Sequence, residues 1–235
     1  MLIETKLQPP YLRDALVQRP RLLRTLGAAT AGKLTVVTSP AGFGKSTLLS
    51  QWAAGISGGI AQVAWLSIDR LDNDLARFLK YLAAAFHRVD PDIAGNAESL
   101  IDSSPVTPVD SILTAIINQL SRRSAPIYLV LDDAHLIVSS EIAACINMLV
   151  AYAPPALRIV LATRGELPLE LAHMKMKGHV VSLGEQRPAL FARGDRGLPC
   201  QCLRSRPRRL GRGGASPQDR RLAGWPAACR IGAGA

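Results

Sequence analysis

The stretch Ser39-Pro-Ala-Gly-Phe-Gly-Lys-Ser-Thr47 decides the fold of this 235-residue chain. It follows a β-prone run over residues 33–38 and opens a helix-prone run over residues 47–54. A strand, a glycine turn and a helix start aim backbone N–H groups and the positive helix end at one point, which suits a phosphate. Lys45 adds a mobile cation, and Ser46 adds a hydroxyl for Mg2+. The predicted nucleotide contacts are Pro40, Ala41, Gly42, Phe43, Gly44, Lys45, Ser46 and Thr47.

One position departs from the strict phosphate-loop pattern G-x-x-x-x-G-K-[ST], because Ser39 stands where the pattern has glycine. A small residue is plausible at that position. Read alone, the stretch also fits a tight turn that carries a lysine by accident. The prediction of a nucleotide site therefore depends on the rest of the chain.

A phosphate loop predicts an acidic residue at the end of a second buried strand. Five apolar residues over 127–131 precede Asp132 and Asp133, which is typical of a parallel strand that carries charge to its carboxyl end. We expect Asp132 to hold Mg2+ directly or through water, and Asp133 to orient or deprotonate the attacking water. The alternative is an ordinary strand end at which Asp133 caps the following segment.

Two further apolar runs also end in polar residues. The run 157–162 leads to Arg164, which is either a sensor of the γ-phosphate or a solvated arginine at a strand end. The run 63–68 leads to acids that could contact the nucleotide or its metal, although the last is better explained as the cap of the next helix. These acids are Asp69, Asp72 and Asp74.

Apolar residues recur at helical spacing in three stretches between these runs. They are Phe78, Leu82 and Phe86; Leu113, Ile116 or Ile117, and Leu120; and Ile142, Ile146, and Leu149 or Val150. A fifth apolar run over 179–183 completes the alternation. The order predicts an α/β fold of the P-loop NTPase type, with a five-stranded parallel sheet covered by helices on both faces. The additional strand before the acidic strand and the polar tip after it favour the ASCE group, which hydrolyses ATP through an acid-activated water, over simple small-molecule kinases.

Five segments resemble the ATP-binding domain of the large LuxR-family transcription regulators of the MalT type, which belong to the STAND signal-transduction NTPases. They are TKLQPPYLRDALVQRPRLL (5–23), SPAGFGKSTLLSQWAA (39–54), VAWLSIDRLDND (63–74), YLVLDDAHLI (128–137) and LRIVLATRGELPL (157–169). Together they cover most of residues 1–185. The first and the third are far more specific than a phosphate loop alone.

The resemblance implies that ATP binding, together with an inducer, drives self-association, and that slow hydrolysis resets this switch. It assigns Lys45 and Ser46 to the ATP phosphates and Mg2+. It makes Asp132 and Asp133 the Walker B pair and places Arg164 at the sensor position. The expected catalytic set is therefore Lys45, Asp133 and Arg164.

Arg19 and Pro20 resemble the family segment that lies near the adenosine, and a surface-packed arm explains them nearly as well. The expected organisation is an N-terminal arm over 1–30, an NTPase core over 31–185 and a tail over 186–235. Family members continue with a winged helix, a helical-repeat sensor domain and a helix-turn-helix. We expect this chain to be truncated before those domains.

The composition changes abruptly after Glu185. Residues 186–235 hold 11 Arg, 2 Asp and neither Lys nor Glu, whereas residues 1–185 hold 17 basic and 16 acidic residues. The formal net charge of +10 therefore belongs mainly to the tail. Without an apolar period, this composition predicts a disordered basic segment, which one interpretation makes an arginine-rich arm for nucleic acid.

A frameshift explains the tail better. Shifted by one base within allowed codons, DRRLAGWPAAC (219–229) can be re-read as TEGWLAGLQLA, and QRPALFARGDRGLPCQC (186–202) as SDLRFSREEIAGFLANA. Both strings are expected of the family after its ATPase core. The tail is then a non-native reading, and we expect no direct DNA binding from this chain.

The predicted function is an ATP–Mg2+-binding regulatory NTPase module. The alternatives are a stand-alone P-loop ATPase or kinase, and a nucleic-acid-binding protein that acts through its tail. No apolar run approaches the roughly 18 residues of a membrane helix, and the N-terminus has no secretory pattern, so we expect a cytoplasmic protein. Cys145 on an apolar helix is predicted to be a buried small hydrophobe, and the other cysteines and histidines lack a zinc spacing.

Overall fold

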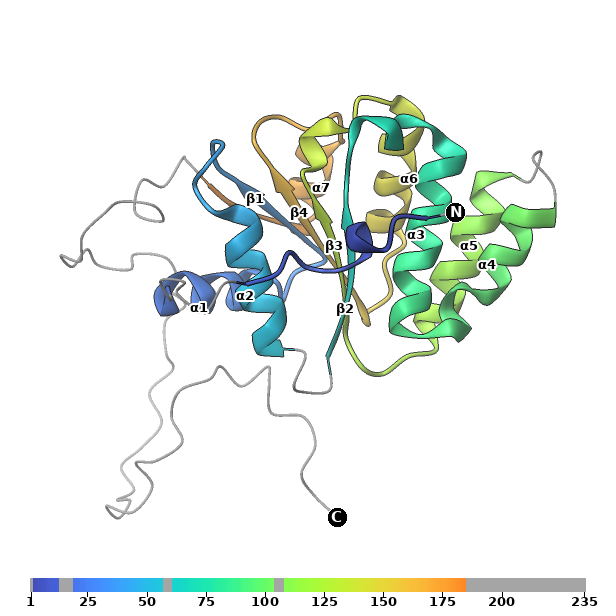
Figure 1. Ribbon diagram of the computed structural model, residues 1–235, viewed down its shortest axis with the longest axis horizontal. Helices are drawn as coiled ribbons and strands as arrows, with labels where there is room; N and C mark the ends of the chain where they lie inside the picture. The colour runs from blue at the N-terminus through green and yellow to red at the C-terminus, as the bar shows by residue number, and fades with distance from the viewer. Residues whose placement is uncertain (1, 13–18, 57–60, 104–107, 185–235) are drawn as a thin grey trace, which may run out of the picture. The chain divides into compact units, whose positions relative to one another are not determined.

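The computed structural model describes residues 2–12, 19–56, 61–103 and 108–184, so the predicted tail lies outside the described residues (Figure 1). Its sheet runs in the spatial order β2-β3-β4-β1-β5, and every neighbouring pair is parallel. The predicted five-stranded parallel sheet is confirmed, and β4 separates the loop strand β1 from the acidic strand β3. The strands are β1 (Leu34–Thr38), β2 (Gln62–Ser67), β3 (Ile127–Asp132), β4 (Leu157–Thr163) and β5 (Val180–Leu183).

Alternate residues of each strand enter two separate cores, because successive side chains of a strand point to opposite faces. In β3, Leu129 and Leu131 belong to the larger core, whereas Val130 belongs to the smaller one. In β4, Ile159 and Val160 divide in the same way. Burial on both faces explains why these strands are continuous apolar runs in the sequence.

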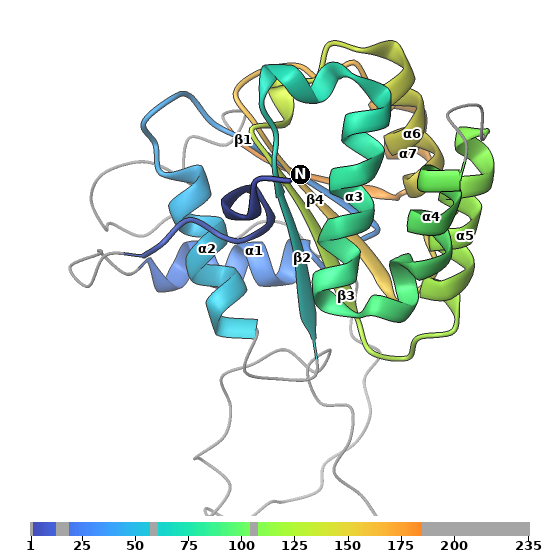
Figure 2. The same cartoon turned by 45° about the vertical axis from the view of Figure 1, so that its right-hand side comes forward.

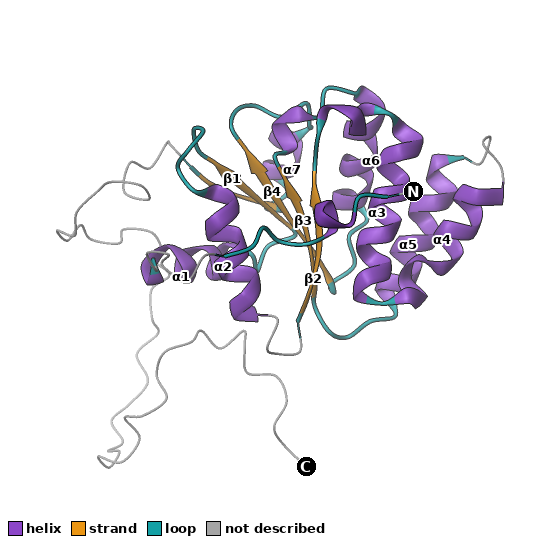
Figure 3. Cartoon of the chain, viewed as in Figure 1, coloured by secondary structure: helices purple, strands orange, loops and turns teal. Residues whose placement is uncertain are grey.

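The smaller core lies under α1 (Pro20–Ala29) and α2 (Lys45–Ile56), on one face of the sheet (Figure 3). Trp52 of α2 meets the ring of Tyr128 edge-on, with 4.9 Å between the ring centroids. α2 is the helix that continues the phosphate loop, so this packing fixes the loop against the sheet.

The larger core lies on the opposite face. α3 and α6 border it, and α4 and α5 lie outside α3 (Figure 2). The three predicted apolar faces are buried here, and of the two candidates in α5 it is Ile116 rather than Ile117 that is fully buried. The helices on this side are α3 (Leu75–Val89), α4 (Pro91–Ser103), α5 (Val109–Ser121), α6 (Ser140–Ala151) and α7 (Leu171–Met176).

Several short or weakly patterned elements were not expected from the sequence. Part of the segment predicted as an arm forms α1, and Pro91–Ser103 forms α4 although Gly95 and Asn96 are poor helix formers. Ile93 of α4 is fully buried in the larger core, so tertiary packing stabilises this helix. The described residues also include three 3-10 turns, η1 (Glu4–Leu7), η2 (Arg70–Asn73) and η3 (Ala134–Leu136).

Two observations bear on the predictions from composition. Within the described part of the chain, no helix is both long and apolar enough to span a membrane. Cys145 is buried in α6, and burial raises the pKa of its thiol to about 11, so it packs as a small apolar residue.

Candidate nucleotide-binding site

The predicted site residues meet at the carboxyl edge of the sheet, where β1, β3 and β4 end side by side. The amide of Ser39, just after β1, donates to the carbonyl of Thr163 at the end of β4, at 3.2 Å. The amide of Ile68, just after β2, donates to the carbonyl of Asp132 at 2.9 Å. Parallel pairing therefore brings together tips that are far apart in the sequence.

The loop between β1 and α2 depends on two glycines. Gly42 and Gly44 have φ angles of 80° and 77°, a left-handed conformation that glycine adopts without a steric cost. α2 begins at Lys45, immediately after the second glycine, and the amide of Leu48 already donates to the carbonyl of Gly44 at 2.9 Å. The positive end of α2 therefore faces the turn, as a phosphate loop requires. Thr47 lies half-buried in the first turn of α2.

Ser39, the one mismatch to the loop pattern, occupies a position that does not need glycine. Among the described residues, Asp133 alone combines a side chain with a positive φ. Ser39 is buried, and its hydroxyl has no hydrogen-bond partner. The departure therefore leaves the loop's backbone conformation intact.

Lys45 is the first residue of α2, and its ammonium turns back toward the backbone of the loop. Its Nζ donates to the carbonyl oxygens of Ser39, at 2.6 Å, and Pro40, at 3.2 Å. Burial lowers the pKa of Lys45, and the positive charge of Arg164 lowers it further, against the two carboxylates after β3. Neutral carbonyls compensate a buried ammonium incompletely, so this cation is available to an anionic ligand.

Asp132 is the buried carboxylate of the site and is 3% exposed. Burial raises its pKa, and the charge of Asp133 adds to the effect. A side-chain hydrogen bond with Ser46 opposes this rise, as does the amide of Asp133, which donates to Asp132 Oδ1 at 3.0 Å. The two residues predicted to hold Mg2+ are therefore in direct contact.

Ser46 and Asp132 fit a magnesium–nucleotide complex better than a metal site made by protein alone. A hydroxyl and a carboxylate supply the hard oxygen ligands that Mg2+ prefers, and nucleotide phosphates and water usually complete its shell. In the described segments, no group of three or more His, Cys, Asp or Glu side chains could hold a metal ion.

Asp133 lies beside both the predicted sensor and a histidine that the sequence analysis did not single out. Its Oδ1 lies 3.4 Å from Nη2 of Arg164 and 3.7 Å from Nδ1 of His135. Burial lowers the pKa of His135, and Arg164 and Lys45 add to this effect while Asp133 and Asp132 oppose it. The position of His135 two residues after Asp133 was the one signal that could have revealed it.

The acids after β2 belong to a different group, which we call the Lys6 cluster. Lys6 is buried and pairs with Asp72 and, at 2.9 Å, with Asp69. Its Nζ also lies 4.2 Å from the centre of the Tyr81 ring. Arg77 donates through Nε to Asp72 at 3.1 Å. The cluster therefore consists of Lys6, Asp69, Asp72, Arg77 and Tyr81.

Asp69 and Asp72 thus bind protein cations, which replaces the suggestion that they contact the nucleotide or its metal. The capping role of Asp74 is confirmed, because Asp74 Oδ1 accepts from the amide of Arg77 at 2.8 Å.

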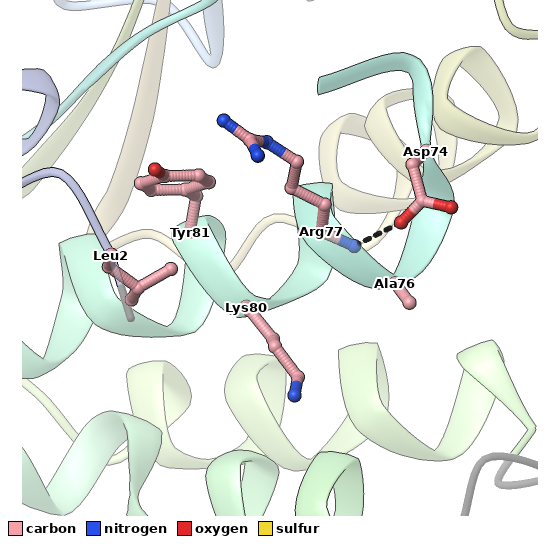
Figure 4. Close-up of a pocket in the computed structure, with 6 residues that line it drawn as sticks. All are labelled: Leu2, Asp74, Ala76, Arg77, Lys80 and Tyr81. Atoms are coloured by element: carbon pink, nitrogen blue, oxygen red, sulfur yellow. Dashed lines mark hydrogen bonds between the residues drawn. The ribbon is translucent and has the colours of Figure 1, made fainter. Parts of the chain in front are cut away.

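A cavity of about 300 Å3 borders the cluster, lined by Leu2, Asp74, Ala76, Arg77, Lys80 and Tyr81. The side chains of Arg77 and Lys80 point away from each other, so they do not converge on one anion (Figure 4). This hollow is therefore a poor match for phosphate. Arg19 and Pro20 lie exposed at the start of α1, which packs against α2.

No protein-family model matches this chain. Among solved structures, Cdc6p from Pyrobaculum aerophilum is 15% identical with a TM-score of 0.51, over 77% of this chain and 49% of that one. The Orc1 protein of Aeropyrum pernix, solved in complex with DNA, is 15% identical with a TM-score of 0.50, over 75% and 47%. A Walker-type ATPase of Pyrococcus abyssi is 15% identical with a TM-score of 0.45, over 77% and 57%.

The present chain spans about half the length of the first two of these proteins. At such identities the likeness concerns the fold alone. The fold is that of the P-loop ATPases, with a five-stranded parallel sheet.

Proposed function

We propose that this chain binds ATP–Mg2+ at its phosphate loop and is the nucleotide-binding module of a LuxR-type regulator resembling MalT. ATP binding and slow hydrolysis act there as a signalling switch. The observation that carries the proposal is the buried ammonium of Lys45, which is held by carbonyls of the loop. It lies at the same edge of the sheet as Ser46 and Asp132, which contact each other.

Each residue of the edge has a role in this proposal. Lys45 and the amides at the start of α2 bind the β- and γ-phosphates. Ser46 and Asp132 hold Mg2+, which neutralises phosphate charge when bound. Asp133 orients or deprotonates the attacking water, and Arg164 stabilises charge on the γ-phosphate.

The regulator assignment is supported by a contact between the two most specific segments of the resemblance. Residues 5–23 and 63–74 are remote in the chain, yet Lys6 of the first is buried against Asp69 and Asp72 of the second. These two segments therefore belong to one structural unit, which supports treating them as a single family signature. In this proposal Arg19 and Pro20 lie near the adenosine. The protein self-associates when ATP is bound, and it acts in the cytoplasm.

Substitution of the loop lysine tests nucleotide binding. We expect Lys45→Ala to abolish ATP–Mg2+ binding in isothermal titration calorimetry while the circular dichroism spectrum is retained. Lys33→Ala is the matched control, because Lys33 precedes β1 at the opposite end of that strand. Undiminished affinity in Lys45→Ala would remove the central claim.

Hydrolysis is tested separately. Asp133→Asn should bind ATP normally and release no phosphate, because an amide cannot deprotonate water. Equal hydrolysis in this variant reassigns the catalytic acid. In the parent chain, rapid steady-state turnover without partners would favour a stand-alone ATPase over a switch.

A further inference from the structure

His135 carries a buried polar atom that the structure leaves unsatisfied. Its Nδ1 has no hydrogen-bond partner, a property shared among the described side chains only with the hydroxyls of Ser39 and Ser50. A buried unsatisfied polar group costs about 1–3 kcal/mol, so its retention calls for a reason. The carboxylate oxygen Oδ1 of Asp133 faces it at 3.7 Å, just beyond hydrogen-bond distance.

The ring faces that oxygen as a donor. Burial lowers the pKa of His135, so the imidazole is neutral near pH 7 and carries one proton. Placing that proton on Nδ1 avoids two lone pairs meeting across the 3.7 Å gap. A small rotation of the Asp133 side chain then closes a hydrogen bond of about 2.9 Å.

Such a rotation of the carboxylate does not require the backbone of Asp133 to move. Its φ is 54°, and its amide donates to Asp132 Oδ1 at 3.0 Å. The carboxylate therefore moves mainly about its side-chain bonds. Its Oδ1 has two competing donors, Arg164 Nη2 at 3.4 Å and the Nδ1 of His135.

The two donors differ in how firmly they are anchored. The side chain of Arg164 is 47% exposed. The turn η3 that carries His135 is tied to the loop after β2, since Asn73 Nδ2 donates to the carbonyl of Leu136 at 2.8 Å. Asn73 Oδ1 also accepts from the amides of Val138, at 2.8 Å, and Ser139, at 3.0 Å. His135 is thus the fixed donor and Arg164 the movable one.

We infer that His135 is a positioning residue for ATP hydrolysis: its Nδ1–H takes over the carboxylate of Asp133 when Arg164 turns toward the γ-phosphate. Asp133 is thereby held by a neutral donor while it orients the attacking water. This inference rests on the proposed function.

Three substitutions separate this role from a structural one. The amide nitrogen of His135→Asn comes close to the place of Nδ1, whereas that of His135→Gln comes close to the place of Nε2. We expect His135→Ala and His135→Gln to lower kcat by about 10- to 100-fold, as for other groups that orient a functional side chain, with KM unchanged. His135→Asn should retain most of the activity.

A second measurement needs no hydrolysis. In the nucleotide-free full chain, Arg164→Ala releases Asp133, so the bond to His135 should form without ATP and shift the Nδ1–H proton resonance downfield in NMR spectra. Arg164→Ala combined with Asp133→Asn should lack this shift. In the parent chain, ATP–Mg2+ should produce the same shift as Arg164→Ala.

The outcomes are distinguishable. Equal rescue by Gln and Asn, an unchanged kcat in His135→Ala, or no downfield proton in Arg164→Ala would each overturn the role of His135. Failure of the parent chain to bind ATP would overturn the proposed function, while the nucleotide-free spectra still test the contact. If His135→Ala does not fold, the comparison of Asn with Gln decides.

Discussion

The nucleotide site and the Lys6 cluster are two groups of buried charge at the same edge of one sheet, and they differ in how completely their charges are paired. In the Lys6 cluster, the buried carboxylate of Asp72 accepts from Lys6, Arg77 and the amide of Asp69. At the nucleotide site, Lys45 is held by carbonyls, and His135 Nδ1 has no partner.

The difference shows how charged residues that bind a ligand can be told apart from charged residues that stabilise the fold. Partnered charges stabilise the apo protein and leave nothing for a ligand to satisfy. Incompletely compensated charges cost free energy in the apo protein, and a ligand of opposite charge recovers it. Substitutions of charged residues should therefore destabilise the cluster and spare or stabilise the site.

The largest effect is expected at the centre of the Lys6 cluster. Asp72→Ala leaves the buried ammonium of Lys6 without its closest partner and should lower the free energy of unfolding by about 3–5 kcal/mol in urea denaturation. Asp102→Ala is the control, because its pair with Lys80 is 3.6 Å long and exposed, and it should change stability by about 0.5 kcal/mol or less. Similar losses in the two variants would erase the distinction.

A smaller effect is expected in the phosphate loop. A Cβ on Gly44 would meet nothing within 4 Å, so Gly44→Ala isolates the cost of a side chain at a φ of 77°, about 1–2 kcal/mol. ATP affinity should fall with it. Gly55→Ala, within α2, should instead stabilise the protein by up to about 1 kcal/mol. Unchanged stability in Gly44→Ala would mean that the loop relaxes its backbone.

A reversed sign is expected at Asp132. Because its pKa is raised in the folded state, its contribution to stability is complete below the unfolded value near 3.8 and is lost as pH rises through the folded pKa. At pH 7 the ionised carboxylate opposes folding, so Asp132→Asn should stabilise the nucleotide-free protein. The variant should also lack the part of the fall in unfolding free energy between pH 3.5 and 7 that ionisation of Asp132 causes. Binding of ATP–Mg2+ should weaken. If Asp132→Asn is less stable than the parent chain at pH 7, Asp132 stabilises the apo protein as the charges of the Lys6 cluster do.

The smallest effect on stability is expected at Arg164. Its contact with Asp133 is 3.4 Å long and half exposed, so Arg164→Ala should change the free energy of unfolding by about 0–1 kcal/mol. Arg88→Ala, which removes the 3.8 Å exposed pair with Glu4, should match it in stability. Only Arg164→Ala should lower phosphate release from ATP, and equal turnover in both variants would contradict the sensor role.

The central strands β3 and β4 were predictable because they are apolar on both faces, and the phosphate loop because Gly42, Gly44 and Lys45 carry a local mechanism. Their meeting at one edge follows from parallel pairing alone. α4 was not predicted because Gly95 and Asn96 have low helix propensity, and the helix is stabilised by tertiary contacts instead.

The remaining features depend on pairings that local patterns do not record. Lys6 meets its carboxylates across 63 and 66 residues, so nothing near Lys6 in the sequence announces its burial. His135 acquires meaning only through the left-handed turn at Asp133, an uncommon conformation for aspartate that periodicity does not predict.

Three of the four hydrogen bonds of the Asn73 side chain have a consequence for the order of folding. They close loops of 63, 65 and 66 residues, and their partners are adjacent only when β2 lies against β3. Closing such long loops costs entropy before any contact rewards it. We therefore expect the turn that bears His135 to be ordered late, after β2 and β3 have paired, so that a newly made chain holds its sheet before it holds this turn.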